Sequence, residues 1–212
     1  MPLYLGGFMK YQQTLFTPAN SSTTGFASSV TGASFTLTAT TSGDSLAHKV
    51  TVTNLTATDH SGKTLSIVGT DENGFAQSES ITAPAGSATV TSTKYYLNLT
   101  SVTPSATIGS DTFSIGWNNT FVTKTYPINW RRGNAALNLD ITGTINIDVN
   151  ETFDDIQTKT TAFTWVVDSS SHAGITADTS LLWSAHSKGI RLKANSYSDT
   201  ATINMSYTQR DI

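Results

Sequence analysis

Few residues in this sequence have side chains that could do chemistry: histidines, one acidic cluster and four tryptophans. Asp59-His60-Ser61 brings together the three residue types of a serine-hydrolase triad. Adjacent residues on a turn point in different directions, however, so they cannot form the hydrogen-bond chain that activates a serine nucleophile. The sequence also lacks the G-x-S-x-G motif that exposes a nucleophile on a strand-to-helix turn. We therefore expect no catalytic residues and no enzyme activity.

The four histidines, His48, His60, His172 and His186, could bind a metal only if folding brought them together. None of them has a partner at the H-x-H, H-x-x-x-H or H-E-x-x-H spacing that supplies paired ligands. The sequence has no cysteine, which excludes thiolate-bound zinc, iron–sulfur clusters and disulfides. We expect solvated or hydrogen-bonded histidines, with no metal and no cofactor.

Glu151, Asp154 and Asp155 form the densest acidic cluster. Carboxylates can bind calcium or perform acid–base catalysis. The cluster lacks the D-x-[DN]-x-[DN]-G pattern of a calcium loop, and neighbouring acids do not specify the separation that a glycosidase needs. We predict a structural or interface role for these residues.

The four tryptophans are Trp117, Trp130, Trp165 and Trp183. Their flat faces could stack on sugars, or they could pack in a core or an oligomer interface. A carbohydrate-binding or receptor-binding module is therefore an alternative function of a different class, and it would require exposed tryptophans in a shallow groove.

Hydroxyl groups rather than charges make this chain polar. Its 212 residues include 38 Thr and 26 Ser, whereas 13% are charged and the formal net charge is -3. The 12 Lys and Arg are spread thinly and form no basic patch for nucleic acid. No segment approaches the about 20 apolar residues of a membrane helix, and the N-terminus shows no secretion signal. We expect a soluble, unprocessed chain that binds neither nucleic acid nor membranes.

Apolar residues alternate with Ser, Thr or Asn along most of the chain, which is typical of strands with one buried face. Thr suits the outward positions because its β-branched carbon fits the pleat while its hydroxyl faces water. Asn73-Gly74 favours a tight hairpin turn after Asp71 and Glu72. The predicted strands span residues 34–40, 49–58, 64–70, 77–83, 88–93, 95–102, 112–117, 137–141, 144–149, 161–167, 189–195 and 200–208. This pattern predicts an all-β fold of antiparallel β-sandwich domains of the jelly-roll or Ig-like type. Residues 178–185 fit either a short helix or a strand.

We expect three parts: an extended N-terminal arm over residues 1–30, a first β-sandwich domain over 31–120, and a second β-rich domain over 121–212. The first 30 residues are apolar but aperiodic, so they either order against a neighbouring subunit or form an extended first strand on the same domain. The residues predicted to contact neighbouring subunits are Leu5, Phe8, Tyr11, Phe16, Trp130 and Arg131.

Six segments of the sequence resemble small β-rich virion structural proteins of tailed bacteriophages. They are IVGTDENG at 67–74, ESITAP at 79–84, TKYY at 93–96, PINWR at 127–131, VNETFDDI at 149–156 and GIRL at 189–192. The resemblance spans most of the chain, and its motifs are strand and turn patterns without catalytic residues. It implies a virion component assembled in the host cytoplasm.

Within that class, the resemblance implies a capsid decoration or cement protein that stabilises the particle through subunit contacts. Many symmetric copies would reinforce each modest interface. A neck or tail component, such as a tube, adaptor or fibre-base protein, is the nearest alternative. The expected partners are further copies of the chain, in a homo-oligomer, and either the major capsid protein or neck and tail proteins.

Overall fold

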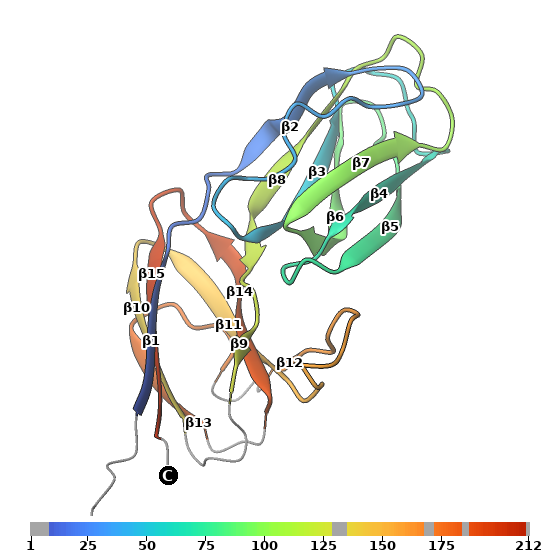
Figure 1. The fold of residues 1–212 in the computed structure, drawn as a ribbon. Helices are drawn as coiled ribbons and strands as arrows, with labels where there is room; N and C mark the ends of the chain where they lie inside the picture. The colour runs from blue at the N-terminus through green and yellow to red at the C-terminus, as the bar shows by residue number, and fades with distance from the viewer. Residues whose placement is uncertain (1–8, 129–134, 168–171, 184–186, 211–212) are drawn as a thin grey trace, which may run out of the picture.

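The computed structural model describes residues 9–128, 135–167, 172–183 and 187–210, and the regular structure in these ranges is β-strand (Figure 1). Each paired strand runs antiparallel to its partner. The predicted all-β antiparallel sandwich fold is thereby confirmed. No helix in the described ranges has the length and apolarity needed to cross a membrane. The strands are β1 (Met9–Phe16), β2 (Ser22–Val30), β3 (Ala47–Asn54), β4 (Thr64–Thr70), β5 (Ala76–Thr82), β6 (Thr89–Tyr96), β7 (Asn98–Pro104), β8 (Phe113–Val122), β9 (Tyr126–Pro127), β10 (Ala135–Thr142), β11 (Ile145–Thr152), β12 (Val166–Val167), β13 (Thr179–Trp183), β14 (Gly189–Tyr197) and β15 (Thr202–Arg210).

The first sandwich packs the three-stranded sheet β5-β4-β7 against β2, β8, β3 and β6. Strand β4 shows the alternation that the sequence predicted, because Leu65 and Ile67 are fully buried whereas Thr64 and Ser66 are exposed. Burial of these apolar faces drives the two sheets together. The core comprises Phe26, Ala27, Val30, Phe35, Val50, Val52, Leu65, Ile67, Ala83, Tyr96, Leu99, Val102, Ile108, Phe113, Ile115 and Trp117.

The second sandwich packs the four-stranded sheet β1-β15-β10-β13 against β12, β11 and β14, with β9 beside β14. Leu137 and Leu139 of β10 and Ile203 and Met205 of β15 point into it. Its core comprises Phe16, Leu46, Phe121, Tyr126, Ile128, Ala135, Leu137, Leu139, Ile145, Ile147, Val149, Leu181, Ile190, Leu192, Ala194, Tyr197, Ala201, Ile203, Met205 and Tyr207.

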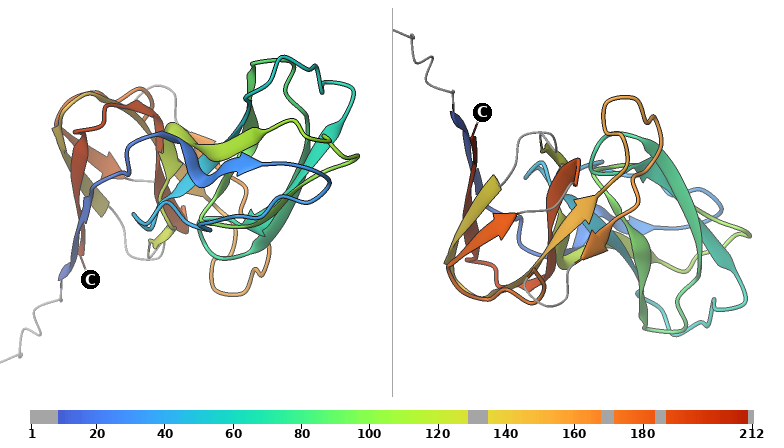
Figure 2. Two further views of the ribbon diagram at one scale, coloured as in Figure 1. Left: turned by 90° about the horizontal axis from the view of Figure 1, so that it is seen from above. Right: turned by 90° about the horizontal axis from the view of Figure 1, so that it is seen from below.

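Strand β8 joins the two sandwiches. It pairs with β2 and β3 in the first sandwich, and its last residues, Phe121 and Val122, pair with Ala194 and Lys193 of β14. An eight-stranded sheet therefore runs through both halves, which lie side by side in Figure 2. Six of its strands follow the order β12-β11-β14-β8-β3-β6, and β2 and β9 pair with β8 and β14 beside this path. The core changes over within this strand, because Trp117 belongs to the first core and Phe121 to the second.

Residues 9–30 lie in the segment for which the sequence left open an arm or an extended first strand, and they contain β1 and β2, joined by residues 17–21. β1 pairs with β15 along its whole length, so the first and last strands lie side by side (Figure 1). β2 pairs with β8 in the first sandwich. The periodicity of β1 is hard to recognise because Tyr11 and Leu15 are exposed, while Gln12 and Thr14 are more buried than either.

The strand predicted over residues 34–40 is wrong, because this segment is an irregular connection between β2 and β3. The backbone N–H groups of Thr38 and Ala39 both donate to the carbonyl oxygen of Phe26, at 2.8 and 3.2 Å, instead of forming a ladder. Phe35 is still buried, with its ring centroid 5.8 Å from that of Phe113. The alternating apolar residues therefore reflect core packing without strand pairing.

Other local predictions can be compared directly with the structure. The hairpin turn between β4 and β5 is confirmed, since Gly74 has a φ of 85° and Asp71 Oδ1 accepts hydrogen bonds from the backbone N–H groups of Asn73 and Phe75, both at 2.9 Å. Within residues 178–185, the structure shows strand β13 rather than a helix. The strand predicted over 161–167 is confined to Val166–Val167, and the residues before it form a loop.

Candidate functional site

The residues predicted to contact neighbouring subunits have different positions in the structure. Tyr11 is 60% exposed on β1, whereas Phe16 is only 7% exposed and packs in the second core. Phe16 therefore holds β1 onto its own sandwich. Leu5, Phe8, Trp130 and Arg131 lie outside the described residues.

The side of the β1-β15-β10-β13 sheet that points away from the second core is exposed, and we call it the outer face. The strand register pairs Tyr11 with Thr208, Thr208 with Ala136, and Ala136 with Leu182, so these residues form one row across the sheet. Leu182 is 72% exposed, and a shallow hollow of ≈ 230 Å³ lies along this row. Further residues of the outer face are Gln13, Leu15, Asn138, Asp140, Ser180, Asn204 and Ser206.

The outer face carries few charged residues. Asp140 is the only charged one among the members named above, and strand register places Arg210 in the same alternation at the end of β15. The other named members are apolar or carry hydroxyl or amide groups. Side-chain hydrogen bonds connect several of them: Tyr11 donates to Gln13 at 2.9 Å, and Gln13 donates to Asn204 at 2.9 Å. Strands β1 and β13 form the two edges of this sheet. β13 contains no charged residue or proline, whereas β1 contains Lys10. Edge strands without charges or prolines can pair with other chains.

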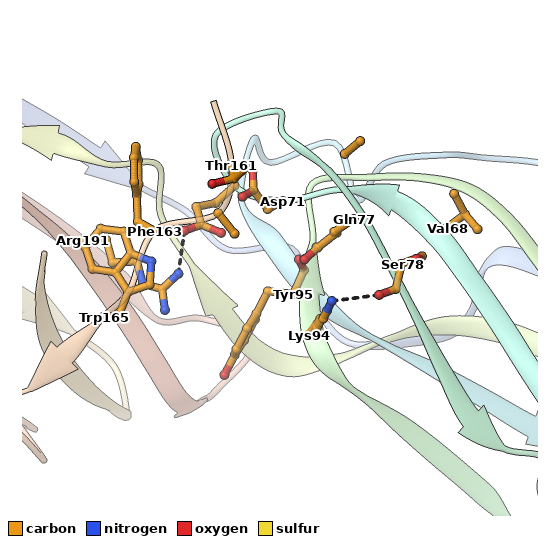
Figure 3. A pocket seen from close by; sticks show the side chains of 13 residues that line it. Val68, Asp71, Gln77, Ser78, Lys94, Tyr95, Thr161, Phe163, Trp165 and Arg191 are labelled. Atoms are coloured by element: carbon orange, nitrogen blue, oxygen red, sulfur yellow. Dashed lines mark hydrogen bonds and ion pairs between the residues drawn. The ribbon is translucent and has the colours of Figure 1, made fainter. Parts of the chain in front are cut away.

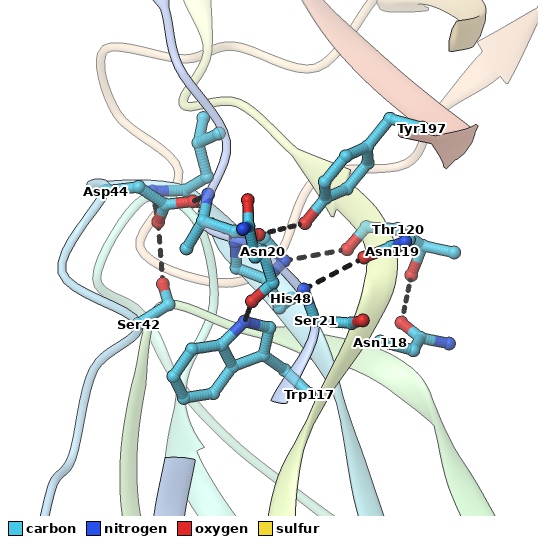
Figure 4. Close-up of polar contacts among 12 residues, drawn as sticks. Asn20, Ser21, Ser42, Asp44, His48, Trp117, Asn118, Asn119, Thr120 and Tyr197 are labelled. Atoms are coloured by element: carbon cyan, nitrogen blue, oxygen red, sulfur yellow. Dashed lines mark hydrogen bonds and ion pairs between the residues drawn. The ribbon is translucent and has the colours of Figure 1, made fainter. Parts of the chain in front are cut away.

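The histidines of the described residues have hydrogen-bonding or ionic partners. His48 is buried between the two cores, where Nε2 lies 2.8 Å from Asp44 Oδ2 and Nδ1 lies 3.0 Å from the carbonyl oxygen of Thr120 (Figure 4). His60 Nε2 lies 2.9 Å from Asp111, so its carboxylate partner is not the adjacent Asp59. His172 and Glu151 lie 3.7 Å apart, and His186 is outside the described residues. In the described part of the chain, no group of three or more acidic or histidine side chains could hold a metal ion.

The second candidate site is a groove with a volume of ≈ 690 Å³ between the first sandwich and the loop that precedes β12 (Figure 3). We call it the junction groove. Strands β4, β5 and β6 supply one side, and the loop and Arg191 of β14 supply the other. Its lining residues are Val68, Asp71, Glu72, Ala76, Gln77, Ser78, Lys94, Tyr95, Thr161, Ala162, Phe163, Trp165 and Arg191.

Arg191 organises the loop side of the junction groove. Its Nη1 donates to Glu72 Oε1 at 2.5 Å, which links β14 to the turn between β4 and β5. The guanidinium carbon also lies 4.2 Å from the centroid of Trp165, a cation–π contact. Burial lowers the pKa of Arg191 below its usual value, and the Glu72 carboxylate offsets part of that shift. The ion pair is therefore largely shielded from water.

The acidic cluster of the sequence shapes the same loop. Asp154 Oδ2 accepts hydrogen bonds from Lys159 Nζ at 2.5 Å and from the backbone N–H of Thr164 at 2.6 Å. These hydrogen bonds hold the pKa of Asp154 below its usual value. Asp155 Oδ1 accepts from the backbone N–H of Gln157 at 3.1 Å. These contacts give Asp154 and Asp155 a structural role in the loop that carries Trp165, and the interface role that the sequence also allowed stays a prediction.

The tryptophans divide between core and groove. Trp117 is buried in the first core, where its Nε1 donates to the carbonyl oxygen of Asn20 at 3.0 Å (Figure 4). Trp165 is partly exposed and lines the junction groove. Trp130 and the side chain of Trp183 lie outside the described part of the structure. The sequence identified Trp165 as a possible sugar platform, but it gave no sign of Gln77, Lys94 and Tyr95 opposite, because these meet Trp165 only through the fold.

Comparisons of this chain with protein-family models and with curated protein sequences give no match. Functional inference therefore depends on the residues and surfaces described above.

Proposed function

We propose that this chain is a structural protein of a tailed-bacteriophage virion, acting as a capsid decoration or cement protein through contacts between copies. The observation that carries the proposal is the outer face, a β-sheet surface with exposed Tyr11, Leu15 and Leu182, on which Asp140 is the only charged side chain that the structure describes. The phage-like strand and turn segments of the sequence support the same class of protein.

A second copy of the same chain is the occupant that fits the outer face. In a two-fold contact each surface meets its own copy, so a face of one charge sign would repel itself. The outer face largely avoids this repulsion because, apart from Asp140, its named members are apolar side chains, hydroxyls and amides. Among the described strands β1 pairs with β15 alone, so its other edge borders the face and is open to a strand of a neighbouring copy. The sequence before β1 is also apolar, with Leu3, Leu5 and Phe8.

Two substitutions that each introduce a negative charge test this proposal. Leu182→Glu places a carboxylate on the outer face, whereas Leu55→Glu places one on a leucine that is 50% exposed outside it, after β3. Neither change removes a buried side chain, so both variants should fold. We expect Leu182→Glu to lower the oligomer mass in analytical ultracentrifugation and the occupancy on purified phage particles, and Leu55→Glu to leave both unchanged.

Equal mass and equal particle occupancy for the two variants would refute the outer-face contact. Absence of the protein from purified particles would refute the virion role itself. Quantitative mass spectrometry of the same particles tests the position, since a cement protein is expected in hundreds of copies. A handful of copies would overturn the cement assignment in favour of the neck or tail.

A further inference from the structure

We propose that the junction groove binds a neutral oligosaccharide. This inference is independent of the virion role, because it concerns a different surface, formed by β5, β6, β14 and the loop before β12. Its volume of ≈ 690 Å³ lies within the range of about 300–1,000 Å³ that is typical of ligand sites.

The lining of the groove has the two kinds of groups that sugars require. Tyr95 of β6 is partly exposed on one side of the groove, and Phe163 and Trp165 of the loop before β12 are partly exposed on the other, so a ligand would meet aromatic rings on two sides (Figure 3). Aromatic faces bind the C–H faces of a pyranose ring. Ser78 supplies a hydroxyl group, which can donate to and accept from sugar hydroxyls. Gln77 Nε2 donates one hydrogen bond to the carbonyl oxygen of Tyr95, and its Oε1 is the acceptor that the side chain adds to the lining.

The aromatic residues are held in place before any ligand binds. Trp165 stacks on Arg191, which is fixed by its ion pair with Glu72. Phe163 makes an edge-to-face contact with Phe75, with ring centroids 5.7 Å apart. A rigid platform lowers the entropic cost of binding, since few side chains must be ordered by the ligand.

The charges of the groove favour a neutral ligand. Glu72 compensates Arg191, and Asp71 Oδ1 is engaged by the backbone N–H groups of the turn. Lys94 Nζ donates to the carbonyl oxygen of Ser78 at 2.8 Å. Since the groove contains two acids and two bases, it has no excess of positive charge to attract phosphate or another multiply charged anion.

The geometry favours a sugar over an extended peptide. Peptides commonly bind by adding a strand to an open sheet edge. The edge of β6 that faces β5 is blocked at this position, because the Glu79 carboxylate accepts hydrogen bonds from the backbone N–H groups of Thr93 and Lys94, at 3.0 and 3.1 Å. A peptide would have to displace this carboxylate, whereas a sugar can bind through the side chains of the groove.

The test begins with the full chain on a printed array of bacterial and mammalian glycans. The strongest binder is then titrated by isothermal calorimetry against the wild type and three variants. Trp165→Ala removes the platform, and Ala162→Trp fills the groove from an exposed rim position without removing a native contact. Leu182→Ala, on the outer face, is the matched control.

We expect Trp165→Ala and Ala162→Trp each to weaken binding about tenfold or more, and Leu182→Ala to leave it unchanged. If Trp165→Ala fails to fold by circular dichroism, Ala162→Trp alone decides the result. The proposal is overturned if the wild type binds no glycan on the array, or if affinity survives in Ala162→Trp. It is also overturned if an extended peptide, selected from a random library, binds with Trp165-dependent affinity while glycans do not.

Discussion

Asp44 carries a pH-dependent part of the stability of this protein. Its carboxylate lies in the connection before β3 and is 5% exposed (Figure 4). Oδ2 accepts from the backbone N–H of Ala19 at 2.7 Å and contacts His48 Nε2 at 2.8 Å. Oδ1 accepts from Ser42 Oγ at 2.6 Å and from the backbone N–H of Leu46 at 3.0 Å. The perturbation we consider is Asp44→Asn.

The magnitude follows from the pKa of this carboxyl. Burial opposes ionisation of Asp44, but the hydrogen bond and charge of His48, together with the hydrogen bonds from Ala19 and Ser42, outweigh burial and lower the pKa from 3.8 to about 2. At 1.36 kcal/mol per pKa unit, the ionised form stabilises the folded state by about 2 kcal/mol at neutral pH. Because the folded pKa is the lower one, this stabilisation is present above pH 3.8 and is lost as the pH falls through about 2.

Urea unfolding at pH 7 and pH 3 measures this effect. We expect Asp44→Asn to be less stable than the wild type by about 2 kcal/mol at pH 7. The difference should narrow by about 1 kcal/mol at pH 3, where the wild-type carboxylate is partly protonated in the unfolded chain. The exposed Asp199→Asn is the control and should follow the wild type at both pH values. A stability difference between Asp44→Asn and the wild type that is the same at pH 7 and pH 3 would refute the reasoning.

Four further substitutions test the fold by thermal or urea unfolding. Leu192→Ala, in the second core, should lower the free energy of unfolding by about 2–5 kcal/mol. Leu182→Ala, on the outer face, should change the free energy of unfolding of the monomer by less than about 0.5 kcal/mol. Similar losses in the two variants would contradict the assignment of inner and outer faces. Gly116→Ala should lower the free energy of unfolding by about 1–3 kcal/mol, because the new Cβ would lie 1.7 Å from a backbone carbonyl oxygen of β2. If this variant were as stable as the wild type, β2 would not pass β8 so closely. Glu72→Gln should lower the free energy of unfolding by about 3 kcal/mol, because the buried guanidinium of Arg191 loses its charged partner. An unchanged melting curve would argue against that ion pair.

The sequence predicts strands well where one face of the strand is buried and the other is exposed to water. The prediction over 64–70 coincides with β4, since Leu65 and Ile67 are inward and Ser66 is outward. The alternation of apolar and polar residues does not predict strands where a segment is buried without pairing, or pairs while it exposes apolar side chains. The irregular segment around Phe35 alternates because it packs on the core, and β1 lacks alternation because it exposes Leu15.

The two candidate sites depend on contacts between distant parts of the chain, which local patterns cannot encode. The outer face brings Tyr11 beside Thr208 and Leu182 in line with both through the register of four strands. The junction groove places Trp165 opposite Tyr95 because Arg191 and Glu72 hold two different sandwiches together. The sequence predicts the types of residue that a site would use, whereas strand register determines which of them meet.

Imaging of purified particles, at a resolution that traces the chain, is the most direct test of the central claim. Under the proposed virion role, the particles to image are those of a tailed phage that carries the coding sequence. The account predicts many copies on the capsid shell, each with Tyr11 and Leu182 of its outer face buried against a neighbouring copy. Particles that lack the chain, or in which the outer face is open to solvent in every copy, would contradict it.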